Sequence, residues 1–191
     1  MKSDKNLVIG ITGRRGSGKN AVAGMLDLYL WRKYDTNCHK FAFADLIKEE
    51  LCKYTGGHLN ILRQNKEILR PVLQFWGDLI RDRLIPTIDA KIAALKSPYL
   101  VIIPDVRLLK EAEYLKAKYN AVILHIERRK LDDNGMYLPL DYNPNVDNHP
   151  TEREVDLICG DYRIMNTGSL EYLSKLEVRS FADYLLNHNL V

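Results

Sequence analysis

Cysteine is scarce in this chain and too widely spaced to build a structural site. The three cysteines are Cys38, Cys52 and Cys159, and they form no C-x-x-C pair. This pattern excludes a disulfide framework and a zinc site made from cysteine pairs. It favours a reducing compartment, and we expect a cytoplasmic protein.

Long apolar runs and linker-like stretches are also lacking. The N-terminal MKSDKN precedes an apolar run, LVIGITG, that is too short for the core of a signal peptide. No stretch reaches the roughly 20 apolar residues that span a bilayer. We found no internal repeat, low-complexity tract or Pro/Gly/Ser-rich linker. The sequence therefore predicts a single domain that does not enter a membrane.

Charge of either sign is not in large excess. The formal net charge of +3 is too small to indicate a nucleic-acid-binding surface. The arginines nevertheless gather in three pairs: Arg14 and Arg15, Arg81 and Arg83, and Arg128 and Arg129. Because guanidinium groups bind phosphates well, we expect a small anionic molecule as partner and no nucleic acid. Both a monomer and a homodimer remain open.

Short apolar, β-branched runs alternate with segments of helical periodicity. Strands are expected at residues 7–12, 39–44, 99–103 and 121–126, with a weaker fifth strand at 163–165. Helices are expected at residues 19–34, 108–119 and 170–186. The alternation is typical of right-handed βαβ units. It predicts an α/β fold, with a five-stranded parallel sheet between layers of helices.

Two long stretches interrupt this alternation. Residues 45–97 carry several helical patterns, and we interpret them as a helical insertion that binds substrate. The patterns are expected to break at Gly56, Gly57, Pro71 and Pro86. Residues 128–150 are rich in Asp, Asn, Gly and Pro, which favours a functional lid over an ordinary surface loop. Residues 1–44 and 98–191 would then form the core of the domain.

The most informative motif is a glycine-rich loop that satisfies the G-x-x-x-x-G-K pattern. Its residues are Gly13, Arg14, Arg15, Gly16, Ser17, Gly18, Lys19 and Asn20. Glycines let successive backbone N–H groups point inward, and the following helix directs its positive end at the same place. An apolar strand is expected before the loop and an amphipathic helix after it, as this motif requires. The loop is therefore predicted to bind the phosphates of ATP, with Lys19 as a catalytic cation.

Asn20 departs from the usual motif, which has Ser or Thr at this position. A hydroxyl there normally binds Mg²⁺, and an amide oxygen would bind the ion or one of its waters less tightly. Asp105 follows the run at 99–103, at the edge of the sheet where ligands bind in open α/β folds. We therefore expect Asn20 and Asp105 to hold Mg²⁺. The alternatives are weakened catalysis for Asn20 and a helix N-cap for Asp105.

The motifs favour a small-molecule kinase over a GTPase. The string Asn65-Lys66-Glu67-Ile68 lacks the Asp of the base-reading NKxD motif. A kinase for a small metabolite needs instead a helical insertion after the second strand and a lid bearing arginines after the fourth, so that both phosphates are shielded from water. Both features are expected here.

Several segments resemble the phage-type deoxynucleoside monophosphate kinases. In chain order they are ITGRRGSGKN, FADLIKEEL, LRPVLQFWGDLIRDR, VIIPDVRLLKEAEYL and DNHPTE. Asn20, and Leu46 in place of an expected Pro, depart from the family pattern. The resemblance implies a three-layer α/β/α P-loop kinase fold and transfer of the ATP γ-phosphoryl group to a deoxynucleoside monophosphate, giving ADP and the diphosphate. Phosphomevalonate kinases of the P-loop type share part of the pattern, and an ATP-binding module without catalysis is a further alternative.

The acceptor-binding residues are expected mainly in the insertion. Arg70 and Arg81 would grip the acceptor phosphate, and Gln74 would read the base. Asp45, at the end of the second expected strand, would orient the acceptor. Arg107, two residues after Asp105, would reach a phosphate of acceptor or donor.

Each of these assignments has a purely structural alternative. Arginines on helices are often only solvated, and Asp45 could be a helix N-cap. Phe75 and Trp76, beside Gln74, could stack on a base or simply pack in the core.

The remaining candidates lie after the fourth expected strand. Arg128 and Arg129 begin the lid and would stabilise charge on the transferring phosphoryl group, unless they are only solvated. The DNHPTE segment has no derived role, and Thr151 with Glu154 fits a capping box. The turn at 166–169 would border adenine or simply start a helix.

Overall fold

The computed structural model describes residues 6–34, 38–65, 68–131, 137–139, 150–167 and 172–188. Across these ranges, no helix is both long enough and apolar enough to cross a bilayer. The chain forms two compact units. One comprises Met1–Lys40 and Lys96–Val191, and the other is Phe41–Leu95.

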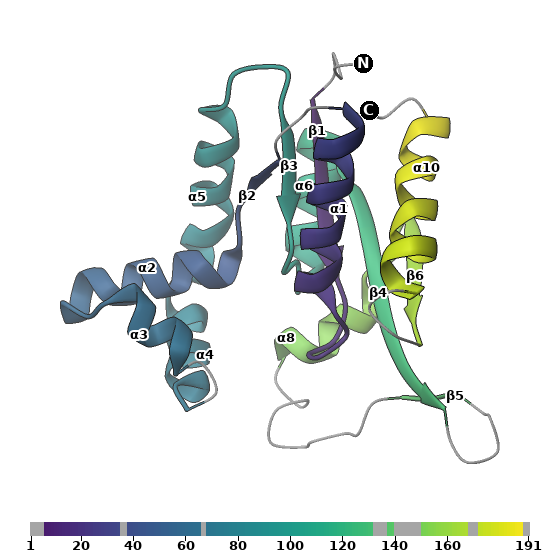
Figure 1. Ribbon diagram of the computed structural model, residues 1–191. Helices are drawn as coiled ribbons and strands as arrows, with labels where there is room; N and C mark the ends of the chain where they lie inside the picture. The colour runs from purple at the N-terminus through teal and green to yellow at the C-terminus, as the bar shows by residue number, and fades with distance from the viewer. Residues whose placement is uncertain are drawn as a thin grey trace. The chain divides into compact units, whose positions relative to one another are not determined.

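The larger unit is built on a parallel sheet of five strands (Figure 1). The strands are β1 (Leu7–Thr12), β2 (Cys38–Lys40), β3 (Leu100–Ile103), β4 (Val122–Leu131) and β6 (Tyr162–Asn166). Their order is β2-β3-β1-β4-β6, and every pair is parallel. The predicted α/β fold with a five-stranded parallel sheet is therefore confirmed. A short strand that was not predicted, β5 (Tyr137–Pro139), pairs antiparallel with the end of β4.

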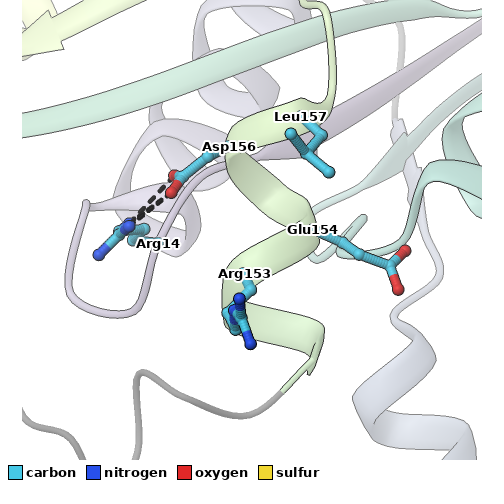
Figure 2. Close-up of a pocket in the computed structure, with 5 residues that line it drawn as sticks. All are labelled: Arg14, Arg153, Glu154, Asp156 and Leu157. Carbon is cyan, nitrogen blue, oxygen red and sulfur yellow. Dashed lines mark hydrogen bonds and ion pairs between the residues drawn. The ribbon is translucent and has the colours of Figure 1, made fainter.

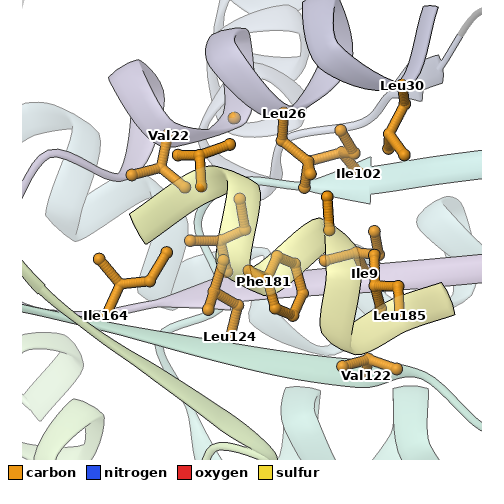
Figure 3. Packing of buried hydrophobic residues seen from close by; sticks show 14 of the residues in the cluster. Ile9, Val22, Leu26, Leu30, Ile102, Val122, Leu124, Ile164, Phe181 and Leu185 are labelled. Atoms are coloured by element: carbon orange, nitrogen blue, oxygen red, sulfur yellow. The ribbon is translucent and has the colours of Figure 1, made fainter. Parts of the chain in front are cut away.

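Strand β1 lies at the centre of the sheet and alternates between its two faces. Leu7, Ile9 and Ile11 belong to one buried cluster together with Leu26 and Phe181. The cluster joins the sheet to α1 (Lys19–Tyr34), to the π-helix η2 (Leu173–Val178) and to α10 (Arg179–Asn187). Figure 3 shows the side chains that α1 and α10 contribute. This apolar face fixes where β1 ends and α1 begins, and so positions the loop between them.

The opposite face of β1 packs against α6 (Leu109–Tyr119). Gly10 is needed there, because a Cβ atom at this position would lie 2.7 Å from Ile123 Cδ1 and 3.1 Å from Val106 Cγ2. Two short helices, α8 (Pro150–Arg153) and the 3-10 helix η1 (Glu154–Leu157), follow in the chain, and η1 also contacts α6. The sheet is thus covered by helices on both faces.

The smaller unit is entirely helical in the residues that the structure describes. Its helices are α2 (Phe43–Thr55), α3 (Leu59–Gln64), α4 (Arg70–Leu79) and α5 (Arg81–Ala93). Helix α2 contacts the other three. The expected break at Gly56 is found, since this residue ends α2 with a left-handed φ of 65°. Pro71 lies in the first turn of α4, where proline is tolerated.

Four expectations about the elements are wrong in detail. Pro86 does not break a helix but lies inside α5. The second strand ends at Lys40 instead of residue 44, because the helical pattern that begins at Phe43 takes over. Asp45 therefore lies in the first turn of α2, where a carboxylate favours the helix dipole, and the N-cap is Ala42. Strand β4 extends to Leu131 instead of ending near residue 126.

Candidate phosphate-binding site

The loop between β1 and α1 has a backbone that requires glycine. Gly13, Gly16 and Gly18 have φ values of 141°, 74° and 102°, which side chains rarely allow. A Cβ atom on Gly13 would lie 2.2 Å from the carbonyl oxygen of Ile126, and one on Gly18 would lie 2.7 Å from Asn166 Nδ2. The loop is therefore pressed against the ends of β4 and β6. Both its conformation and its surroundings exclude larger residues at these two positions.

Lys19 is the first residue of α1, and its side chain folds back over the loop. The residue is only 8% exposed. Its ammonium group donates hydrogen bonds to the carbonyl oxygens of Gly13, at 2.5 Å, and Arg14, at 2.7 Å. A buried cation held by loop carbonyls places a full positive charge next to the positive end of α1. The arrangement suits a polyanion.

Two side chains from strands that are far from the loop in the sequence donate hydrogen bonds to its backbone. The Nη1 atom of Arg128, in β4, donates to the carbonyl oxygen of Gly16 at 3.1 Å. The side-chain amide of Asn166, the last residue of β6, donates to the carbonyl oxygen of Ser17 at 2.8 Å. Arg128 was expected at the start of a lid, but it lies within β4 and contacts the loop directly. For Asn166, the observed contact is with the loop backbone, a role that the sequence did not suggest.

The proposed lid is described only at its ends. Strand β4 continues through Arg128 and Arg129 to Leu131, so these arginines do not leave the sheet. Arg129 pairs in register with Pro139 of β5. Residues 132–136 and 140–149 of the lid lie outside the described residues. The catalytic role expected for Arg129 stays a prediction.

Asp105 and Arg107 follow β3 and approach the same edge of the sheet as the loop. The backbone N–H of Val106, between them, donates to the carbonyl oxygen of Ile11 in β1 at 3.0 Å. Asp105 is buried, and it is not the N-cap of α6, because Leu108 occupies that position. The capping alternative for Asp105 is therefore wrong. Its expected role as a metal ligand stays a prediction.

A buried glutamate caps α6 in place of Asp105. The Oε2 atom of Glu111 accepts hydrogen bonds from the backbone N–H groups of Arg107, at 2.8 Å, and Leu108, at 3.1 Å. Burial raises the pKa of Glu111 to about 7, although these two hydrogen bonds oppose the shift. The negative charge of Asp105 contributes to the rise. This carboxyl group therefore titrates near neutral pH beside the candidate site.

Glu152, in α8, connects the loop to Arg107. Its Oε2 atom accepts a hydrogen bond from the backbone N–H of Arg15 at 2.9 Å. Its Oε1 atom accepts one from Nη1 of Arg107, so that the two residues form an ion pair. Glu152 is almost completely buried. The sequence offered only the DNHPTE string as a signal for this residue, and no role followed from it.

The next two carboxylates in the chain, Glu154 and Asp156, have partners other than those of Glu152. Asp156 makes two-pronged contact with Arg14, with Nε–Oδ1 and Nη2–Oδ2 distances of 3.0 and 2.5 Å. Glu154 accepts from the backbone N–H of Leu109 at 3.2 Å. The side chain of Thr151 lies outside what the structure describes, so the capping box expected between Thr151 and Glu154 stays a prediction. Figure 2 shows Arg14 facing Asp156, while Glu154 points to the other side of the helix.

A pocket of about 480 Å³ opens beside this pair. Its lining residues are Arg14, Arg153, Glu154, Asp156 and Leu157. Four of these residues lie on the two short helices, and Arg14 lies on the loop. The pocket adds solvent-accessible space next to Arg14.

Among the described residues, the loop region offers buried hydroxyl donors for phosphate oxygens and few ligands for a divalent cation. The hydroxyl groups of Thr12 and Ser17 are buried, and neither has a hydrogen-bond partner among the described residues. Such groups are stabilised by an added acceptor. Asn20 is exposed at the start of α1. The described ranges contain no cluster of three or more His, Cys, Asp or Glu side chains, so a cation would depend largely on phosphate oxygens for its ligands.

In the smaller unit, Asp45 forms hydrogen bonds with basic neighbours. Asp45 accepts from Lys48 Nζ at 2.7 Å and from Arg63 Nη2 at 3.4 Å. Burial would raise the pKa of Asp45, but the hydrogen bond and charge of Lys48, with those of Arg63, outweigh it and hold the pKa below its usual value. Arg81 forms an ion pair with Asp78. The structure therefore gives both residues internal partners, and their substrate-binding roles stay predictions.

The two aromatic candidates on α4, Phe75 and Trp76, differ in how far they are exposed. Trp76 is half-buried and packs edge-on against the exposed ring of Tyr54, with ring centroids 5.3 Å apart. Phe75 is 69% exposed. Gln74 is half-buried beside it, and Arg70 begins the same helix. Phe75 is therefore the aromatic ring of this segment that remains accessible for stacking.

The similarity of this chain to known proteins is weak. No family model matches the chain. No curated protein matches it either. Among solved structures, shikimate kinase from Acinetobacter baumannii in complex with shikimate is 14% identical, with 98% of this chain and 97% of that chain covered and a TM-score of 0.49. A sugar kinase from Janibacter sp. HTCC2649, in an unliganded structure, is 13% identical, with 93% and 95% covered and a TM-score of 0.44.

Proposed function

We propose that the chain is a P-loop phosphotransferase that uses Mg-ATP to phosphorylate a small phosphorylated metabolite, with a deoxynucleoside monophosphate as the leading acceptor. The observation that carries the proposal is the loop between β1 and α1. It combines left-handed glycines, the positive end of a 16-residue helix and the buried ammonium group of Lys19. These features together bind and neutralise phosphate groups.

Phosphoryl transfer depends mainly on positioning and charge neutralisation, and the residues around the loop have these capacities. The loop amides and Lys19 would hold the ATP phosphates. Arg128 contacts the loop at Gly16 and would place a second positive charge near the transferring group. Asn20 and Asp105 would hold Mg²⁺, and the ion would supply positive charge that neutralises the phosphate groups.

The chemistry of α4 supports a nucleoside monophosphate as acceptor, and the family resemblance supports the deoxy sugar. Phe75 offers an exposed ring on which a base can stack, and the amide of Gln74 can hydrogen-bond to a base edge. Arg70, on the same helix, would bind the acceptor phosphate in two-pronged fashion. An isoprenoid phosphate acceptor would need no base-stacking ring.

Two alternatives follow from particular residues. The partial resemblance to phosphomevalonate kinases favours another phosphorylated metabolite as acceptor. Asn20, in place of a hydroxyl residue, favours a module that binds ATP without turnover. An acceptor panel separates all three possibilities.

The test is formation of ADP from Mg-ATP in the presence of each of the deoxynucleoside monophosphates, the ribonucleoside monophosphates, phosphomevalonate and shikimate. We expect ADP formation with at least one deoxynucleoside monophosphate. Lys19→Ala should abolish it, whereas Lys33→Ala, at the exposed end of the same helix, should retain it. ADP formation only with phosphomevalonate would reject the acceptor that we propose, and retention of ATP without transfer to any acceptor would reject catalysis.

A further inference from the structure

The Glu152 carboxylate has an unusual position for an acidic group at an anion-binding loop. It is 1% exposed and bonds both to a backbone N–H of the loop and to the Arg107 guanidinium. A carboxylate loses much hydration energy on burial, which only a paired charge and further hydrogen bonds restore. Here both oxygens have such partners, one each. The fold therefore holds this charge in place between two groups of the candidate site.

Only one nitrogen of the Arg107 guanidinium takes part in the contact with Glu152. Arg107 is held through Nη1, and its side chain keeps 24% of its surface exposed. Within the described part of the chain, its other guanidinium nitrogens have no hydrogen-bond acceptor. Arginine can present two N–H groups side by side to a phosphate. One edge of Arg107 is thus fixed by Glu152, while no described residue accepts a hydrogen bond from the remaining guanidinium donors.

The neighbouring carboxylates do not share this arrangement. Glu154 bonds to the backbone at the start of α6, and Asp156 forms a half-exposed pair with Arg14. Of the three, Glu152 alone joins the loop backbone to a separate arginine. The link connects residue 15, after the central strand, to residue 107, after its neighbour β3.

We propose that Glu152 is a positioning residue of the phosphate site, which holds Arg107 against the loop so that its remaining donors face the ATP phosphates. The inference rests on the proposed function, since it assumes that the loop binds a nucleotide. Preorganised charge costs no reorganisation when the ligand arrives. Loss of the carboxylate should therefore weaken binding, although it also removes a negative charge from the site.

A different role for the same carboxylate would give the opposite result. If Glu152 merely occupied the place of a phosphate, its neutralisation would free Arg107 and the Arg15 N–H and would tighten nucleotide binding. If it only stabilised the fold, neutralisation would lower the unfolding temperature and leave affinity unchanged. The direction of the change in affinity therefore discriminates between these roles.

The experiment is calorimetric titration of Mg-ATP into the wild-type chain, Glu152→Gln, Arg107→Gln and the double variant. We expect E152Q to raise the Kd about tenfold. We expect the double variant to bind no more weakly than R107Q alone, because Glu152 acts through Arg107. The matched control is Glu154→Gln, the same atom exchange two residues along, for which we expect a Kd within about twofold of wild type.

Unchanged or tighter binding by E152Q would overturn the proposal, as would additive losses in the double variant. If E152Q shows no cooperative thermal transition, Glu152→Asp replaces it. This variant keeps the charge but shortens its reach, and it should still weaken binding severalfold. If E152D binds ATP as tightly as the wild type does, the proposal is overturned. ATP binding without transfer to any acceptor would reject the kinase function alone, and the comparison of affinities would still decide the role of Glu152.

Discussion

The side-chain amide of Asn166 donates a hydrogen bond to the backbone carbonyl of Ser17, 149 residues earlier in the chain. The same amide nitrogen lies 2.7 Å from where a Cβ atom of Gly18 would be. One side chain at the end of β6 therefore both supports the loop and restricts which residues it can contain.

Replacement of Asn166 by Ala should loosen the loop. The carbonyl of Ser17 would lose its buried donor, which costs on the order of 1–3 kcal/mol. We expect a lower free energy of unfolding in urea and a weaker affinity for Mg-ATP. Asn187→Ala, at the exposed end of α10, is the control and should change neither quantity measurably. Unaltered stability and affinity in N166A would show that the amide does not support the loop.

Substitution by alanine should have opposite effects on stability at Gly18, just before α1, and at Gly24, within α1. Gly18 has a φ of 102° and no room for a methyl group, so Gly18→Ala should destabilise the chain and abolish nucleotide binding. Gly24 lies within α1, where an added Cβ atom would meet nothing within 4 Å, so Gly24→Ala should stabilise the helix by about 0.5–1 kcal/mol. Thermal unfolding and ATP titration of both variants provide the measurement. Equal behaviour of the two would contradict the loop geometry.

Glu111 should make stability depend on pH. Its pKa is raised from an ordinary value of 4.5 to about 7, so the folded chain binds this proton more tightly than the unfolded chain. The resulting stabilisation is complete below pH 4.5 and is lost as the pH rises through 7, a change on the order of 3 kcal/mol. Glu111→Gln removes this titration, while a single amide oxygen can still accept both backbone N–H bonds.

The measurement for Glu111 is the free energy of unfolding between pH 4.5 and 8. The difference between E111Q and wild type should grow with pH in favour of E111Q. Glu113→Gln, exposed on the same helix, should follow the wild-type profile. Parallel profiles for all three proteins would show that Glu111 is not the titrating group.

Substitution of Phe75 should affect substrate binding, whereas substitution of Trp76 should affect stability. Phe75→Ala should leave the unfolding temperature nearly unchanged, because the ring is exposed, but should raise the KM for a deoxynucleoside monophosphate acceptor. Trp76→Ala removes the contact of a half-buried ring with Tyr54 and should destabilise the chain by roughly 0.5–3 kcal/mol. An unchanged acceptor KM in F75A would remove this ring from the base-binding site.

Local patterns were sufficient to predict the elements that flank the loop. Residues 7–12 and 19–34 were expected as strand and helix, and the structure has β1 and α1 at those bounds. An apolar run and a glycine-rich turn act locally, so the sequence signal is strong. The short β2 was overextended because Phe41, Ala42 and Phe43 suit a strand as well as a helix start, and tertiary context decides between them.

The braces around the loop could not be predicted, because their partners are far apart in the sequence. Glu152 meets Arg15 across 137 residues, and Arg128 meets Gly16 across 112. Nothing in a single sequence indicates such pairs. The sequence placed Arg128 near phosphate, whereas it placed Asn166 in a turn that would border adenine or start a helix, and it did not indicate a contact of Asn166 with the loop.

The most direct test of the account is titration of Mg-ATP into the wild-type chain and Lys19→Ala in parallel. The buried ammonium group of Lys19 lies at the centre of the phosphate site that we propose. We expect saturable binding by the wild-type protein and a loss of at least about tenfold in affinity in K19A, with both proteins folded by thermal unfolding. Absence of ATP binding by the folded wild-type protein, or equal affinity in K19A, would contradict the account.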